Sequence, residues 1–173
     1  MKRVAVIIGH DKTSPGAYSP YLHTSEYMYN SEVASYLGGI ADIYKRPLGG
    51  GYTTQMRKLA EMLNPKNYDL VVELHFNSFS DSSANGCEAI VYPGNDFSYM
   101  VGYDFCQKLS SQYQTNNRGV KEHGKGDRGF VFLSLMEAPA IIVEPFFGSN
   151  EEAEKFENEA KYAELIKDWL KCI

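Results

Sequence analysis

The sequence lacks the long hydrophobic run that a membrane-spanning helix requires. Its main apolar runs, at 4–8 and 140–143, are far shorter than the roughly 20 residues that cross a bilayer. It also lacks a cluster of Lys and Arg, and its formal net charge is −5, so nothing favours binding to a phosphate backbone. We therefore expect neither insertion into a membrane nor nucleic-acid binding.

Cysteine is scarce: Cys87, Cys106 and Cys172 lie far apart and form no C-x-x-C motif. These spacings favour neither a disulfide framework nor a zinc–thiolate cluster, and unpaired thiols fit folding in a reducing compartment. The basic residues 2–3 precede an apolar run, 4–8, that is too short for the core of a signal peptide. We expect synthesis in a host or bacterial cytoplasm without a signal peptide.

At 173 residues, 43% hydrophobic and 23% charged, the chain suits one domain with a substantial core. Segments with strand character alternate with segments of helical periodicity, which predicts an α/β fold. We expect a single domain over residues 1–173, with a twisted, mostly parallel β-sheet flanked by helices on both faces. Strands are expected at 4–8, 40–44, 70–75, 87–92 and 140–144, with a short strand or edge piece at 130–135. Helices are expected at 25–37, 53–63, 98–113 and 151–170, and a glycine- and charge-rich connection at 115–129.

Three of the apolar runs stop at a side chain suited to metal binding or acid–base chemistry. They are 4–8, 70–74 and 140–143, and they lead to His10, His75 and Glu144. Continuous β-branched runs are typical of strands buried on both faces of a parallel sheet, and ligands bind at the carboxyl ends of such strands. The sequence therefore predicts that two imidazoles and a carboxylate converge on one edge of the sheet, which favours zinc hydrolysis.

A third ligand is expected from the helix that follows the first strand, because zinc is usually held by several N, O or S donors. At about 100° per residue, Glu26 lies on the same helix face as Asn30, Val33 and Leu37, whereas Glu32 points away. A carboxylate on this buried face costs free energy unless it is paired or bound to a cation. Glu26 is therefore the candidate for the third ligand.

A structural interpretation of the same residues stays open. A histidine at a strand end is commonly a hydrogen-bonded core residue, and a glutamate in the first helical turn commonly complements the helix dipole. The H-E-x-x-H motif of many zinc proteases is absent. Spacing alone therefore does not establish a metal site.

Six short motifs follow one another along nearly the whole chain. They are VIIGH at 6–10, EYMYN at 26–30, ELHFN at 73–77, GCEAIVY at 86–92, NRGVK at 117–121 and PAIIVEPFFGSN at 139–150. In this order they resemble the catalytic domain of zinc-dependent N-acetylmuramoyl-L-alanine amidases, the group found in bacterial cell-wall remodelling enzymes and phage endolysins.

The resemblance implies one Zn²⁺ per chain, held by His10, Glu26 and His75, and a catalytic carboxylate at Glu144. It implies hydrolysis of the amide between N-acetylmuramic acid and L-alanine in peptidoglycan. Zinc would polarise the carbonyl and acidify a water, and Glu144 would pass the water's proton to the leaving amine. The alternative for Glu144 is a buried acid paired with a cation such as Arg118 or Lys121.

Departures from the family pattern favour a phage-type endolysin. Glu73 stands where many bacterial relatives have serine, and the loop 76–86 is too short for the blocking helix of some regulated bacterial amidases. Asp11 follows His10 in place of the usual glycine, so the entry loop is expected to differ in shape. By analogy, the enzyme would act on the cell wall after release through a separate membrane pore protein.

Other polar residues near the expected site have two interpretations each. Glu73 shares strand parity with His75, so it either orients that histidine or pairs with a basic residue. Asn77 either contacts substrate or caps its loop, whereas His123 and His23 are expected in a loop and just before a helix. Four tyrosines either form a substrate-stacking lip or pack in the core: Tyr18, Tyr21, Tyr27 and Tyr29.

Two other functions stay open at this point. One is a different zinc peptidoglycan hydrolase, such as a stem-peptide carboxypeptidase, against which the lack of H-E-x-x-H and of an evident arginine clamp counts. The other is a wall-binding module without catalysis, against which the joint presence of four site residues counts. The sequence does not predict the oligomeric state.

Overall fold

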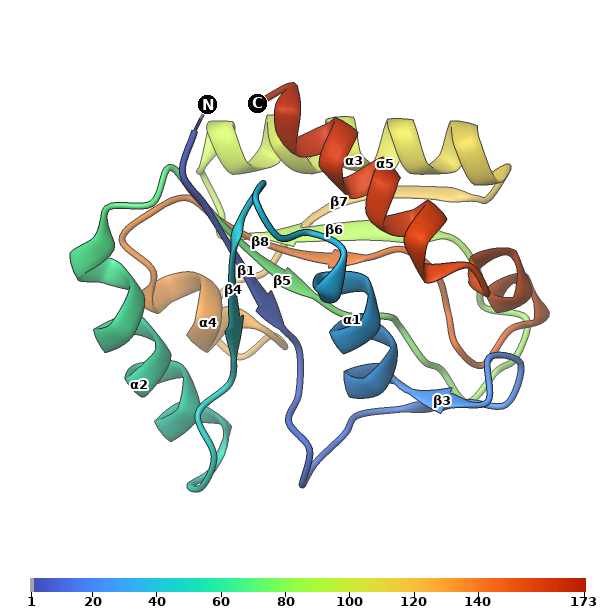
Figure 1. Ribbon diagram of the computed structural model, residues 1–173, viewed down its shortest axis with the longest axis horizontal. Helices are drawn as coiled ribbons and strands as arrows, with labels where there is room; N and C mark the ends of the chain where they lie inside the picture. The colour runs from blue at the N-terminus through green and yellow to red at the C-terminus, as the bar shows by residue number, and fades with distance from the viewer. Residues whose placement is uncertain (1) are drawn as a thin grey trace.

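A six-stranded β-sheet forms the centre of the protein, whose structure is a computed structural model that describes residues 2–173 (Figure 1). In spatial order its strands are β4 (Asp42–Lys45), β1 (Val4–Ile8), β5 (Leu70–Leu74), β8 (Ala140–Glu144), β6 (Cys87–Val91) and β7 (Asn117–Glu122). Neighbouring strands pair in parallel except β8 and β6, which are antiparallel. The predicted α/β fold with a mostly parallel sheet is confirmed.

The four inner strands are built from the apolar runs of the sequence. Every residue of β1, β5, β6 and β8 is buried, because helices cover the sheet on both sides. Three residues of these strands carry a charge, namely Glu73, Glu88 and Glu144. A buried charge is costly unless it is paired, so each of these carboxylates needs a partner.

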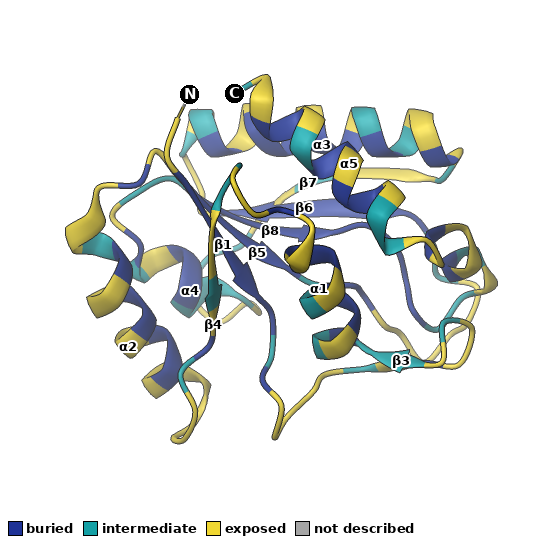
Figure 2. Ribbon diagram, in the orientation of Figure 1, coloured by how far each residue is buried: buried dark blue, intermediate teal, exposed yellow. Residues whose placement is uncertain are grey.

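Helices lie on both faces of the sheet, as predicted (Figure 1). On one face lie α1 (Glu26–Ser35), α3 (Asp96–Tyr113) and α5 (Glu159–Lys171), which supply Val33, Phe105 and Ile166 to one apolar core. On the other face lie α2 (Tyr52–Leu63) and α4 (Phe130–Leu135), which supply Leu59 and Phe132 to a second core. Figure 2 shows these helices buried on one side and exposed on the other.

None of the helices within residues 2–173 combines the length and apolar character needed to cross a membrane.

Helix α1, which carries Glu26, begins where the sequence predicts. The hydroxyl of Ser25 caps it by accepting a hydrogen bond from the N–H of Met28 at 3.4 Å. Glu26 and Asn30 are buried on the expected face, although the helix ends at Ser35, two residues earlier than predicted. A short hairpin that the sequence did not predict precedes it, formed by β2 (Tyr18–Ser19) and β3 (Thr24–Ser25).

The prediction of a strand or edge piece at 130–135 is wrong, because this segment forms helix α4. A short apolar run is compatible with either a buried strand or a buried helix. Here Phe132 and Leu133 pack into the second core, and the N–H of Leu133 donates to the carbonyl of Gly129 at 3.1 Å. Gly129 has φ 76, a left-handed conformation that glycine adopts readily and that turns the chain into the helix.

Two further segments differ from the prediction. The expected connection at 115–129 contains the edge strand β7, whose mostly exposed residues carry no apolar pattern. The expected helix at 151–170 is divided into a 3₁₀ helix, η2 (Glu151–Phe156), and α5. Asn158 caps the beginning of α5, since its side chain accepts a hydrogen bond from the N–H of Lys161 at 2.9 Å. A further 3₁₀ turn, η1 (Asn64–Lys66), continues α2.

Candidate metal and catalytic site

The predicted site residues meet at the carboxyl ends of the inner strands. His10 follows β1, His75 follows β5, and Glu144 is the last residue of β8. Glu26 reaches the same place from the first turn of α1. All four side chains line one cavity of about 450 Å³. The structure therefore brings together the residues that the sequence predicts to converge.

Glu26 bridges the two histidines. Its Oε2 lies 3.1 Å from Nε2 of His10, and its Oε1 lies 2.6 Å from Nδ1 of His75. One donor atom from each of the three residues lies within 4.8 Å of the other two. Backbone N–H groups orient the carboxylate, since those of Phe76 and Ala17 donate to Oε1 at 3.2 Å and to Oε2 at 3.3 Å.

Opposite charges hold this cluster together. Burial raises the pKa of Glu26, but the two histidines outweigh it and hold that pKa well below its ordinary range. Burial lowers the pKa of His75, but the carboxylates of Glu26 and Glu73 outweigh it and raise that pKa to about 10. The site is thus built to keep a positive charge beside Glu26.

Two observations indicate that a zinc ion fits these residues. Two imidazoles and one carboxylate are a donor set of catalytic zinc sites, which leave a further position open. Gly16 keeps the space beside them free: a Cβ at this position would lie 2.6 Å from Oε2 of Glu26 and 2.7 Å from the ring of His10. Any other residue at position 16 would therefore intrude between the donors.

The entry loop is shaped by Asp11, the residue that follows His10. Its carboxylate accepts from the N–H groups of Thr13 and Ser14 at 2.7 and 3.0 Å, and from Nε2 of Gln55 on α2 at 2.8 Å. His10 has φ 65, which is unusual for a residue with a side chain. Asp11 therefore fastens the turn that holds His10 in this conformation.

Glu73 pairs with a basic residue, which is one of its two predicted interpretations, and it also lies near His75. Its Oε1 accepts from Nε of Arg46 at 2.7 Å, and its Oε2 lies 3.3 Å from Nε2 of His75. Burial raises the pKa of Glu73, but Arg46 and His75 outweigh it and hold that pKa at about 2. Contact with the far nitrogen of a ligating histidine is a common way of fixing its orientation. Sequence reasoning missed Arg46, because it lies in a loop 27 residues before its partner.

Glu144 is buried and has one cationic partner. Its Oε1 lies 2.9 Å from Nη1 of Arg128, whereas its Oε2 has no hydrogen-bond partner among residues 2–173. Burial raises the pKa of Glu144 to about 7, although the charge of Arg128 opposes this. The sequence suggested Arg118 or Lys121 as the partner of Glu144. The partner is instead Arg128, and Arg118 pairs with Glu88 at 2.8 Å.

The remaining candidates lie around the site in different roles. Asn77 lines the cavity and donates from Nδ2 to Glu88 at 2.8 Å. The ring of His123 contacts the carbonyl of Arg128 at 2.8 Å and is absent from the described cavity lining, as is the ring of His23. Both histidines lie in loops, as expected.

The four tyrosines do not form the lip around the described cavity. Tyr29 is fully buried, and its hydroxyl donates to the carbonyl of Phe156 at 2.9 Å, so it is a core residue. Tyr18 and Tyr21 are exposed, but neither they nor Tyr27 lines the cavity within residues 2–173. The aromatic residues that line the cavity include Phe76 and Tyr52, and sequence reasoning missed Tyr52, at the start of α2.

Comparisons with known proteins identify the family and the fold. Residues 4–172 match the family Amidase_3, described as N-acetylmuramoyl-L-alanine amidase. A search of curated protein sequences finds no match.

Solved structures with the same fold include amidases of bacteria and of an endolysin. The CwlD amidase of Clostridioides difficile, solved in complex with the GerS lipoprotein, has a TM-score of 0.79 and 21% identity over 98% of this chain and 94% of its own. The catalytic domain of the CD27L endolysin, which targets Clostridia difficile, has a TM-score of 0.80 and 22% identity over 99% of this chain and 98% of its own. The catalytic domain of CwlV from Bacillus (Paenibacillus) polymyxa var. colistinus has a TM-score of 0.74 and 23% identity over 99% and 97%.

Proposed function

Because the chain belongs to the Amidase_3 family and is therefore a peptidoglycan amidase, we propose that it cleaves the amide between N-acetylmuramic acid and L-alanine with one zinc ion. His10, Glu26 and His75 would hold the ion, and Glu144 would carry the proton. One observation carries this proposal. Three donor side chains from separate elements meet beside a buried carboxylate whose Oε2 is unpaired within the described residues 2–173.

The protein's own groups account for the orientation of the donors. When bound, zinc supplies a Lewis acid for the scissile carbonyl and lowers the pKa of a water. The N–H groups of Ala17 and Phe76 aim the carboxylate of Glu26 at the histidines. Nε2 of His75 lies 3.1 Å from Nη2 of Arg46 and 3.3 Å from Oε2 of Glu73, and Nδ1 of that ring faces Glu26.

Glu144 is suited to accept a proton and to return it. A general base works best when its pKa lies near the operating pH, and burial raises the pKa of Glu144 to about 7. Its Oε2 faces no protein partner within residues 2–173, so this oxygen is free to take a proton from water and give it to the amine of L-alanine as the amide breaks.

The geometry counts against both rival functions. A carboxypeptidase needs an unpaired cation for the terminal carboxylate of the stem peptide, but the two arginines of the cavity, Arg46 and Arg128, are paired with Glu73 and Glu144. A buried carboxylate oxygen without a hydrogen-bond partner costs free energy, and binding to the cell wall alone gives no reason to keep one beside a metal site.

A phage-type endolysin is our proposal for the biological role. Its support is the short loop between β5 and β6, whose described residues form no helix over the cavity. The similar structures do not discriminate, because they include an endolysin and bacterial amidases at identities that establish the fold alone. Cytoplasmic synthesis and release through a separate pore protein stay predictions, which expression with and without such a pore would test.

Digestion of purified peptidoglycan tests the cleavage site directly. We expect stem peptides that carry a newly free amine on L-alanine, without new reducing sugar ends, because the amide and not a glycosidic bond is cut. Mass spectrometry after amine labelling identifies these products. Release of free D-amino acids instead would indicate a carboxypeptidase and contradict the proposal.

Replacing Gly16 with alanine is expected to weaken zinc binding, because the new Cβ would meet the Glu26 carboxylate and the His10 ring. Perturbations next to metal ligands commonly lower affinity by about 10- to 100-fold. Competition with a chelating dye measures the change in zinc affinity.

The matched control is Gly39→Ala. Gly39 also has positive φ, 83 against 78 for Gly16, but a Cβ there would have no atom within 4 Å. Both variants bear the strain of a left-handed alanine, about 1–2 kcal/mol, so the comparison isolates the effect of the contact with Glu26 and His10. Equal zinc affinity of the two variants would count against a metal site beside Gly16.

A further inference from the structure

The catalytic candidate Glu144 lies directly opposite another glutamate. The antiparallel register of β6 and β8 pairs Glu88 with Glu144, and both carboxylates are buried, at 4% and 3% exposure. Like charges at directly opposed positions of neighbouring strands destabilise a sheet. This arrangement therefore requires a cation between the two side chains.

Arg128 supplies that cation from the loop before α4. Its Nη2 lies 2.7 Å from Oε1 of Glu88, and its Nη1 lies 2.9 Å from Oε1 of Glu144. Nη1 also donates to Oδ1 of Asn77 at 3.4 Å. One guanidinium thus joins the two carboxylates and Asn77, which lies three residues after the end of β5.

Glu88 is held so that it can fix the direction of Arg128. Its Oε2 accepts from Nε of Arg118 on β7 at 2.8 Å, and its Oε1 also accepts from Nδ2 of Asn77 at 2.8 Å. Both oxygens are therefore engaged, and the carboxylate has little freedom to turn. The planar fork of an arginine transmits such an orientation well, because its donors lie in fixed directions.

The consequence for Glu144 is that its two oxygens differ. Arg128 binds Oε1, whereas Oε2 is buried and has no hydrogen-bond partner within residues 2–173. The residue as a whole lines the cavity that also contains His75 and Glu26. The charged groups that act on Glu144 come from each surrounding element: Arg128 from the loop, His75 after β5, Glu26 from α1 and Glu88 from β6.

We propose that Arg128, anchored by Glu88, is a positioning residue that binds one oxygen of Glu144 so that the other is presented to the reaction. This inference rests on the proposed function, because it assigns a role to a partner of the proton carrier. The side chain of Arg128 is 51% exposed, so it reaches Glu144 from the rim and is not part of the core. Its replacement removes no core packing but leaves two buried carboxylates without their shared cation, so the unfolding temperature of each variant is measured beside its kinetics.

Two single variants of Arg128 test the proposal on a soluble muramyl peptide. Arg128→Met should lower kcat by about 10- to 100-fold, the cost of a misplaced catalytic group, with a smaller change in KM and an unchanged zinc content. Arg128→Lys should restore part of kcat, because it keeps the charge but not the fork. The acidic limb of the kcat/KM profile should move to higher pH in Arg128→Met, since a cation beside Glu144 is lost.

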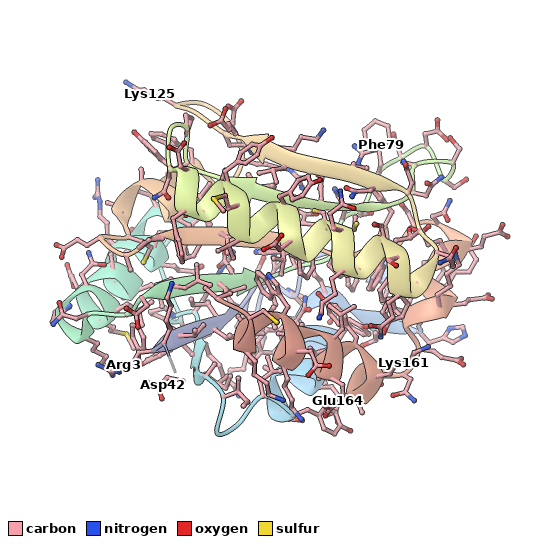
Figure 3. All side chains as sticks on the ribbon, turned by 90° about the horizontal axis from the view of Figure 1, so that it is seen from above. Arg3, Asp42, Phe79, Lys125, Lys161 and Glu164 are labelled. Carbon is pink, nitrogen blue, oxygen red and sulfur yellow. The ribbon has the colours of Figure 1, made fainter. Side chains whose placement is uncertain are left out.

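The control is Lys125→Met, which removes one positive charge from the same loop. Figure 3 shows Lys125 reaching away from the body of the protein, and no described ion pair involves it. This variant should keep the wild-type kcat and pH profile. A loss equal to that of Arg128→Met would mean that loop charge, and not the contact with Glu144, matters, and would overturn the proposal.

A double variant separates positioning from general damage. If Arg128 acts through Glu144, then adding Arg128→Met to Glu144→Gln should change kcat by less than about twofold, whereas independent effects would multiply. Multiplied losses, or wild-type kcat in Arg128→Met, would overturn the inference. A wild-type protein that releases no L-alanine-terminated peptides would instead overturn the proposed function, so the two failures are distinguishable.

Discussion

Replacing Glu144 with glutamine is expected to lower kcat on muramyl peptides about 1,000-fold, within the range that general acid–base catalysis contributes. Glutamine has the same shape but neither accepts the proton of a water nor returns it to the amine. The three predicted metal residues contact one another and not Glu144, so the zinc content should stay at one ion per chain. Steady-state kinetics and metal analysis on the same preparation measure both quantities.

The same variant should gain stability at neutral pH in the metal-free protein. The pKa of Glu144 is about 7 in the folded chain, above its ordinary value of 4.5, so the folded state binds the proton more tightly than the unfolded state. The wild type therefore loses stability as the pH rises from 4.5 to 7, and this part of the slope should be missing in Glu144→Gln. Thermal unfolding at several pH values measures the slope.

Glu61→Gln is the matched control, because Glu61 is exposed on α2 and has the same side chain. It should leave kcat unchanged. Wild-type turnover in Glu144→Gln would remove this residue from the mechanism, whereas loss of zinc would indicate that it acts as a ligand.

Removing the metal is expected to abolish turnover, and one equivalent of zinc should restore it. The fold should survive chelation, because none of the three proposed ligands belongs to either apolar core. A ligand that binds only the folded state adds about 2.7 kcal/mol at a free concentration 100 times its Kd. Zinc should therefore raise the unfolding temperature of the metal-free wild type, which differential scanning calorimetry measures.

Glu26→Ala should lose this stabilisation together with activity, because one carboxylate contacts both histidines. Glu32→Ala is the control: Glu32 lies on the same helix but is exposed. It should bind zinc and hydrolyse substrate as the wild type does. Full zinc binding by Glu26→Ala would contradict the assignment of the third ligand.

The strands that carry the site could be predicted because their signal is local. Runs such as 4–8 and 70–74 are apolar at every position, which is the pattern of a strand covered on both faces. The cap at Ser25 and the buried position of Glu26 also follow from neighbouring residues, since helical geometry fixes which side chains share a face.

Short or exposed elements were less predictable. The run at 130–135 is too short for its periodicity to distinguish a strand from a helix, and packing against the second core decides in favour of α4. The edge strand β7 gains its hydrogen bonds from β6, and its own exposed sequence contains little trace of this pairing.

By itself, the sequence determined the α/β class, the four inner strands and the residues that end them, because each depends on side chains close together in the chain. Only the tertiary structure decided which charges are partners. Arg128 reaches Glu88 across 40 residues, and Glu88 faces Glu144 through the register of two antiparallel strands. Such contacts depend on how distant segments pack, and a buried carboxylate accepts whichever cation that packing brings within reach, which no local pattern specifies.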